Sequence, residues 1–197
     1  MGHESGKATR GPRSDSLRNR EKLLAAAREV FSVGGPDASL EAVARTAGLG
    51  IGTLYRHFPT REALFHAVYR REIDQLVDLA EHLAEDPQPV DALRRWLHAN
   101  VGTIATKKGM LAALAPAPDS SRELYADSAE RLIRSVGILM ARAVAAGGIR
   151  GDISPEDLMR ALVGMCYMRE QPGWQAIVVR LVDVFVDGLR RRERGTD

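Results

Sequence analysis

The sequence predicts an all-α protein of about nine helices, with a small N-terminal helical unit followed by a larger helical domain. Ala, Leu, Val and Arg abound among the 197 residues, whereas aromatic residues make up only 5% of them, and this composition suits helices. Apolar residues, 45% of the chain, recur at helical spacing between Gly and Pro breaks. No strand pattern and no repeat stands out. The length fits one large domain or two small ones.

The chain begins with a basic arm, residues 1–16, that we expect to be flexible because it is rich in Gly, Ser and Arg. Residues 1–20 hold five basic residues against two acidic ones, which gives a net charge of +3. Such an arm can bind phosphates or enter the minor groove of DNA; the alternative is a solvated tail. Arg18 and Arg20, at the start of the first predicted helix at 17–33, are its best candidates for contact.

Two short helices are predicted between residues 39 and 58, on either side of a glycine turn. Ser39 is a good N-cap for the first helix, because its hydroxyl can accept a bond from an unpaired backbone N–H. Gly48 follows where a helix end commonly needs a left-handed residue. In the second helix Leu54 and Phe58 are four residues apart and face inward. A helix-turn-helix of this kind places its second helix in the major groove of DNA.

The outward residues of the second helix suit contact with DNA. Gly52 has no side chain and lets the backbone approach closely, while Thr53 offers a hydroxyl and a methyl group. Tyr55 and His57 can donate hydrogen bonds to phosphate oxygens. Alternatively, Tyr55 is a structural surface residue and His57 caps its helix, whose C-terminus favours positive charge. Thr60 is expected to cap the next helix, whose N-terminus can itself bind a phosphate.

The run GLGIGTLYRHFPTREALF at residues 48–65 resembles the helix-turn-helix signature of the TetR family of transcriptional repressors. The preceding segment fits the same signature, with an amphipathic helix ending in Val30-Phe31 and a Gly34-Gly35-Pro36 break. The patterned region covers residues 18–65, about a quarter of the chain. The signature is specific because the turn glycine, the Gly-Thr-Leu-Tyr run, the His-Phe pair and the following cap all lie in register.

The resemblance implies a DNA-binding domain at 17–65 and an effector-binding and dimerisation domain at 66–197. It implies phosphate contacts along the second helix and base-edge proximity at its tip. Apolar Ile51 replaces a polar or basic residue of some family members, which favours contact with a thymine methyl or a sugar. Arg45 is expected near the DNA backbone or, alternatively, in solvent. The candidates for DNA contact are Arg18, Arg20, Ser39, Arg45, Gly50, Ile51, Gly52, Thr53, Tyr55, His57, Thr60 and Arg61.

A long helix at about 60–85 is predicted to touch both halves of the protein. Its first half can pack on the DNA-binding unit, and its second half can pack on the helices that follow. One rigid rod of this kind could transmit movement between the two domains. Proline and glycine breaks then separate five further helices, at about 90–106, 108–114, 120–146, 154–168 and 174–192.

The last two predicted helices are apolar over more than one face, which suggests a partner. In the TetR family the corresponding pair forms a four-helix bundle with its two-fold mate. The resemblance therefore implies a homodimer that presents two recognition helices to a palindromic DNA operator. A thick monomeric core is the alternative. The candidates for the dimer interface are Leu158, Leu162, Val178, Val182, Phe185 and Leu189.

A small-molecule effector of unknown identity is expected to bind in the C-terminal domain. Ligand sites are mostly apolar with a few polar groups, so candidates are residues larger than packing needs or polar on an apolar face. Each could instead belong to the core. The candidates are Trp96, Asn100, Thr103, Met110, Tyr125, Met165, Tyr167 and Trp174. We expect His98 to be a surface or satisfied histidine, and Cys166 to be an inert core thiol.

Other classes of function find little support in the sequence. The five histidines are scattered rather than set at metal-binding spacing, and no phosphate loop or nucleophile motif is present. We therefore expect no enzyme, no metal and no cofactor. No apolar run is long enough to cross a membrane and the N-terminus is unlike a signal peptide, so the expected location is the cytoplasm.

Two hypotheses follow. The first is a dimeric, sequence-specific repressor that a small-molecule effector releases from its operator. The second is an all-helical small-molecule-binding or adaptor protein of the same fold without specific DNA binding. Salt-dependent binding to DNA separates the two.

Overall fold

The computed structural model describes residues 12–33, 38–114, 121–168 and 172–191. The all-α class is confirmed, because these residues form helices and no strand, with one isolated bridge between Ile149 and Arg190. The elements are α1 (Pro12–Val33), α2 (Leu40–Thr46), α3 (Ile51–His57), α4 (Arg61–Leu83), α5 (Pro89–Leu114), α6 (Ser121–Ala145), α7 (Pro155–Tyr167) and α8 (Trp174–Gly188).

The described ranges hold eight helices rather than the nine predicted, because α5 runs without a break where two helices were expected. The sequence between residues 106 and 108 contains no proline, and Thr106 Oγ1 donates a hydrogen bond back to the Gly102 carbonyl, 3.1 Å away. The anticipated end of the first of these helices was therefore wrong.

Helix α1 starts at Pro12, five residues earlier than the expected start at Leu17. Proline is favoured at a first helical position because its fixed φ suits the helix and its missing N–H is not needed there. The last part of the predicted flexible arm is thus helical. Residues 1–11 of that arm, the expected Gly34-Gly35-Pro36 break and the expected helix start at Ser120 lie outside the described residues.

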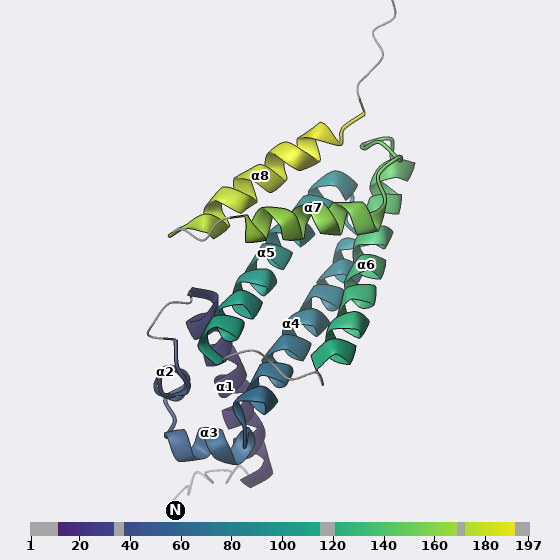
Figure 1. Cartoon of the computed structure of the whole chain (residues 1–197). Helices are drawn as coiled ribbons and strands as arrows, with labels where there is room; N and C mark the ends of the chain where they lie inside the picture. Colours follow the sequence, from purple (N-terminus) through teal and green to yellow (C-terminus); the bar gives the residue numbers. More distant parts are fainter. Residues whose placement is uncertain (1–11, 34–37, 115–120, 169–171, 192–197) are drawn as a thin grey trace, which may run out of the picture.

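The helices are arranged with α1, α2 and α3 at one end and α7 and α8 at the other (Figure 1). Helix α4 leads from α3 into the larger domain and packs there on α5 and α6. Helix α1 packs on α2, α4 and α5. None of the helices described is both long enough and apolar enough to cross a membrane.

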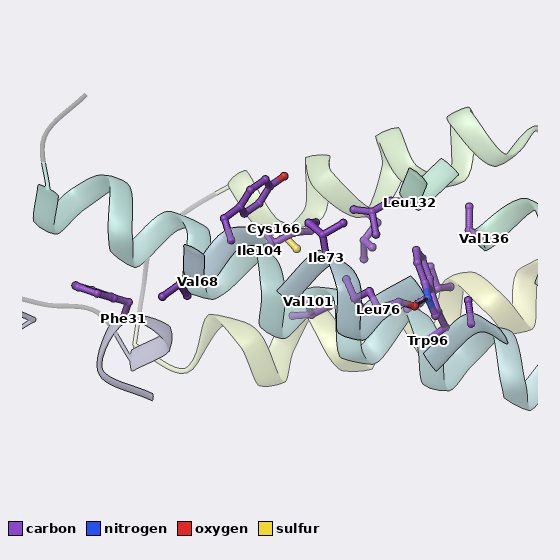
Figure 2. Packing of buried hydrophobic residues seen from close by; sticks show 14 of the residues in the cluster. Phe31, Val68, Ile73, Leu76, Trp96, Val101, Ile104, Leu132, Val136 and Cys166 are labelled. Atoms are coloured by element: carbon purple, nitrogen blue, oxygen red, sulfur yellow. Dashed lines mark hydrogen bonds between the residues drawn. The ribbon is translucent and has the colours of Figure 1, made fainter. Parts of the chain in front are cut away.

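One continuous core joins both ends, from Leu23 in α1 to Val186 in α8. Figure 2 shows part of it, with Phe31 and Val68 toward one end and Trp96 and Val136 toward the other. Trp96 is fully buried and its indole N–H donates a 2.8 Å hydrogen bond to the Leu76 carbonyl. The hydrogen bond satisfies the polar atom that burial would otherwise leave unpaired.

Helices α1 and α5 meet backbone to backbone at Gly109. A Cβ atom at this position would lie 1.8 Å from the carbonyl oxygen of Phe31. Only glycine allows this approach, so Gly109 sets how closely the N-terminal unit joins the larger domain.

Candidate DNA-binding surface and ligand cleft

The turn between α2 and α3 has the geometry that its sequence predicts. Ser39 Oγ accepts a 3.1 Å hydrogen bond from the Ala42 N–H and caps α2. Gly48 has φ of 67°, and the Leu49 N–H bonds back to the Ala44 carbonyl at 2.9 Å. These two features are those of a glycine-ended Schellman cap, which turns the chain sharply after α2.

Helix α3 is anchored by two apolar residues and leaves its other face in solvent. Leu54 is fully buried and Phe58, just after the helix, is 3% exposed. The guanidinium of Arg20 in α1 lies over the Phe58 ring, 5.4 Å from its centroid. Arg20 therefore helps hold α1 against the end of α3, a role that its assignment as a DNA contact did not include.

The tip of α3 is open. Gly50 and Gly52 are exposed, and a Cβ atom added at either position would have no atom within 4 Å. Ile51 is 38% exposed and Tyr55 is 43% exposed. A duplex can therefore approach the backbone of α3 closely and meet one apolar and one phenolic side chain.

The remaining predicted contacts surround this tip. Thr53 and His57 are half-buried, and Arg45 on α2 is exposed. Thr60 Oγ1 accepts a 3.1 Å hydrogen bond from the Ala63 N–H and caps α4. Arg61, the first residue of that helix, is exposed. Arg18 is exposed and lies 3.8 Å from Asp15 of its own helix.

Two residues that were not among the predicted DNA contacts also lie at this end. Asn19 of α1 and Arg56 of α3 line a hollow of about 450 Å³, together with Thr53 and His57. The signal for Arg56 was present, because it lies on the outward side of α3, three residues after Thr53. Asn19 could not be found, since only the crossing of α1 and α3 brings it there.

A separate cleft of about 580 Å³ lies in the larger domain, lined by α4, α5, α6 and α7. Of the eight predicted pocket residues, four line it: Asn100, Thr103, Tyr125 and Tyr167. The other four do not line this cleft. They are Trp96, Met110, Met165 and Trp174.

Core packing explains why most of these four residues do not line the cleft. Trp96 and Met110 are fully buried in the core, and Met165 is half-buried against it. The Trp174 ring lies 4.4 Å from the ammonium of Lys108. A large side chain on a helix was thus a poor guide to the cleft, whereas polar residues on the apolar face of α5 were a good one.

A lysine in the cleft, Lys107, was not among the predicted pocket residues. Lys107 Nζ lies 4.0 Å from the ring centroid of Tyr125 and 5.3 Å from that of Tyr69. Burial lowers the pKa of Lys107 and raises the pKa of Tyr69 to about 12. The sequence signal was a lysine pair in an otherwise apolar stretch of α5.

The predicted dimer residues lie mostly inside the chain's own core. Leu158, Leu162, Val178, Val182 and Leu189 are each 1–5% exposed. Each of them therefore offers little surface to a partner in the single chain, and their place in a dimer interface stays a prediction. Phe185 is half-buried and is the one candidate with some exposed surface.

The outer face of α8 is apolar and exposed. Leu181 is 42% exposed and Val184 is 70% exposed. Ion pairs fix the helix so that this face points outward, because Arg94 of α5 reaches Asp183 at 3.1 Å and Asp187 at 2.6 Å. Helix α8 therefore carries exposed apolar residues beside the buried ones that were predicted for the interface.

Two further groups have structural roles, as expected. His98 Nε2 lies 2.8 Å from Asp183 Oδ1 and adds to the attachment of α8. Cys166 is 1% exposed, and burial raises the pKa of its thiol to about 11. Within the described ranges, no cluster of His, Cys, Asp and Glu could hold a metal ion.

Comparison with known proteins matches both halves of the chain. Residues 23–68 match the family of bacterial regulatory proteins called the tetR family. Residues 88–191 match a family described as the C-terminal domain of SbtR-like transcriptional regulators.

Similar structures cover nearly the whole chain. The crystal structure of the TetR transcriptional regulator SCO0520 from Streptomyces coelicolor is 43% identical and covers 88% of this chain and 99% of that chain, with a TM-score of 0.76. A TetR transcription regulatory protein from Mycobacterium vanbaalenii is 30% identical over 92% of this chain and 100% of its own, with a TM-score of 0.70.

Curated relatives match over a shorter region. The HTH-type transcriptional regulator SAR0097 of Staphylococcus aureus is 31% identical over 85 residues, which are 42% of this chain. The matched region spans 44% of that relative's length.

Proposed function

Because the chain belongs to the TetR family of transcriptional regulators, we propose that it is a dimeric repressor released from its operator by a small molecule. Proteins of this family bind DNA operators and form homodimers. The proposal covers four points: the residues that contact DNA, the surface that forms the dimer, the release by an effector, and a role in regulation rather than catalysis.

The main observation behind the proposal is the exposed N-terminal end of α3. Gly50, Ile51 and Gly52 leave the backbone free to enter a major groove, and Ile51 supplies an apolar contact for a thymine methyl. Tyr55 is placed to donate to a phosphate beside the groove. Since few side chains at the tip can read bases by hydrogen bonds, sequence selection relies also on the shape of the DNA.

Basic side chains around the tip provide the phosphate contacts. Arg45 and Arg61 are exposed on either side of α3, and the N-terminus of α4 lies next to Arg61. Phosphate contacts fix the position of a protein on the duplex without selecting its sequence. In this proposal Arg20 acts mainly by holding Phe58, and Arg18 remains available to the backbone of the DNA.

The dimer forms through the outer face of α8. Leu181 and Val184 are three residues apart, and Ile177 and Gly188 continue the same stripe in both directions. Glycine in such a stripe lets two helices approach closely. A two-fold axis along this face gives two α3 helices, as a palindromic operator requires.

A polar link connects the cleft with the DNA-binding end. Thr103, which lines the cleft, lies 3.4 Å from Glu72 of α4, and the Nε of Arg28 of α1 lies 3.0 Å from the same carboxylate. Glu72 is 2% exposed, so burial raises its pKa while Arg28 lowers it. A ligand that moves Thr103 therefore changes the hydrogen bonding of the buried Glu72 carboxylate, which pairs with Arg28 of α1.

The first experiment is a selection of genomic DNA fragments with the purified protein. The proposal expects a preferred, palindromic site that binds roughly 10³-fold or more tightly than random duplex. Binding without any preferred sequence at moderate salt contradicts the proposal and favours a small-molecule-binding protein of the same fold.

Replacing Arg61 by Gln tests the phosphate contacts on the site so found. Loss of one phosphate contact lowers the slope of log K against log salt by about 0.9. Arg134→Gln is the matched control, because Arg134 is 67% exposed on α6, in the larger domain. Equal slopes for both variants remove Arg61 from the interface.

A further inference from the structure

The cleft in the larger domain is apolar along most of its length and polar at a few points. Ile73, Ile104 and Leu132 contribute apolar walls from three different helices (Figure 2). Its volume of about 580 Å³ is in the range of pockets that hold small organic molecules. The walls therefore suit a ligand with an apolar body, and the polar groups decide what chemistry its other end must have.

Lys107 is the uncompensated charge of this cleft. Among the residues that the structure describes, no carboxylate oxygen lies within 4.0 Å of its ammonium. Of the other charged groups nearby, Arg160 lies 2.7 Å from Asp157 and Glu72 lies 3.0 Å from Arg28, while Glu156 lines the rim of the cleft. Partly burying a cation without a counterion is costly, and among the described residues the rings of Tyr69 and Tyr125 offset part of this cost.

A hydrogen-bond donor without a partner lies beside the same lysine. The hydroxyl of Tyr125 is buried and has no hydrogen-bond partner among the described residues, although Lys107 Nζ lies only 4.0 Å from its ring centroid. The neighbouring Tyr69 differs, because its hydroxyl bonds to Ser128. A buried hydroxyl without a partner is uncommon and costs stability.

Asn100 adds a second incompletely bonded group on the same wall. It is 1% exposed, and its described hydrogen bond goes to the sulfur of Met159 at 3.6 Å, a weak acceptor. Asn100, Thr103 and Lys107 share one face of α5, at spacings of three and four residues. One ligand lying along this face can reach both the lysine and the amide.

We propose that the cleft binds a monocarboxylate with an apolar body, whose carboxylate pairs with Lys107 and accepts a hydrogen bond from Tyr125. A neutral ligand leaves the lysine uncompensated, and a cationic ligand adds repulsion to it. A doubly charged phosphate is less suitable, because among the described lining residues Lys107 is the one cation without an ion-pair partner and Glu156 lies on the rim. This inference rests on the proposed function only in taking the ligand to be the effector.

Matched straight-chain compounds test the proposal by isothermal titration calorimetry. Octanoate, decanoate and dodecanoate, below their micellar concentrations, are compared with octanol, decanol and dodecanol, below their solubility limits. We expect the carboxylates to bind about 10- to 100-fold more tightly than alcohols of equal length, as a charge-assisted hydrogen bond predicts. Equal affinities, or no saturable binding of any carboxylate, overturn the proposal.

Variants of Lys107 then test whether the carboxylate of the ligand binds this side chain. Lys107→Met is expected to remove the preference for carboxylates without changing alcohol binding, whereas Lys107→Arg keeps it. Lys22→Met, which removes an exposed lysine of α1, serves as the control for charge. Wild-type affinity of Lys107→Met for decanoate overturns the assignment.

If Lys107→Met folds poorly, Tyr125→Phe provides a second test of the carboxylate site. It deletes only the unpaired hydroxyl, so the unliganded variant should be at least as stable as wild type while its decanoate affinity falls severalfold. An unchanged decanoate affinity refutes the role of Tyr125. Operator binding is measured separately without ligand, so failure of the proposed function appears there and failure of this inference appears in calorimetry.

Discussion

Replacing Gly109 by alanine tests how the DNA-binding end is joined to the larger domain. The new Cβ would lie 1.8 Å from the Phe31 carbonyl oxygen and 2.8 Å from its carbon, whereas real Cβ atoms essentially never come closer than 3.0 Å. Both atoms belong to the backbone, so no side-chain rotation can relieve the clash, and α1 and α5 must separate by about 1 Å. We expect a loss of about 3 kcal/mol in the free energy of unfolding, at the upper end of overpacking costs.

Gly102→Ala is the matched control, because Gly102 lies on the same helix with nothing within 4 Å of an added Cβ. Alanine should stabilise the helix there by about 0.5–1 kcal/mol. Urea unfolding followed by far-UV circular dichroism measures both variants at one protein concentration, since dimerisation couples stability to concentration. If Gly109→Ala is as stable as Gly102→Ala, the close approach of the two helices is refuted.

The remaining predictions concern the buried carboxylate and the dimer. Arg28→Met leaves Glu72 uncompensated and should cost about 2 kcal/mol at neutral pH, less than a fully buried pair because Arg28 is 55% exposed. Burial raises the pKa of Glu72, so the Glu72 carboxylate binds a proton more readily in the folded protein than in the unfolded chain. The stability that Arg28→Met loses relative to wild type should therefore shrink as the pH falls from about 8 to about 5. The double variant with Glu72→Gln should be more stable than Arg28→Met alone in urea unfolding, and a lower stability contradicts this account. Val184→Lys should convert the dimer to monomer in analytical ultracentrifugation, and an unchanged dimer excludes the outer face of α8 as the interface.

Local signals in the sequence predicted the DNA-binding end well. Caps and turns depend on a few neighbouring residues, so Ser39, Thr60 and Gly48 could be assigned from their chemistry alone. Each assignment has its counterpart in a hydrogen bond or a positive φ. The inward faces of α2 and α3 were also predictable, because a short helix with one apolar face has only one way to be buried.

The larger domain was harder to predict because its helices pack on several neighbours at once. Val182 and Val184 are two residues apart on the same apolar helix, yet Val182 is 1% exposed and Val184 is 70% exposed. Periodicity identifies an apolar face but does not say whether another segment of the same chain covers it. The same limit explains why Trp96 was expected in the pocket and Lys107 was not.

Helix α4 packs on both halves of the protein, as expected, and α1 is also attached to the larger domain at three points near its own C-terminus. Arg28 pairs with Glu72 of α4, Phe31 touches Gly109 of α5, and the Ser32 carbonyl accepts a 3.0 Å hydrogen bond from Gln175 of α8.

The other half of α1 holds the recognition helix through the contact between Arg20 and Phe58. Arg20 and Phe31 lie 11 residues apart on this continuous helix, which corresponds to about 16 Å along its axis. Lys107 and Gly109 are near neighbours on α5, so a ligand that draws Lys107 into the cleft acts close to the contact with Phe31. In the proposed mechanism, a tilt of α1 about this contact would move α3 without any bending of α4 and would change the distance between the two recognition helices of a dimer.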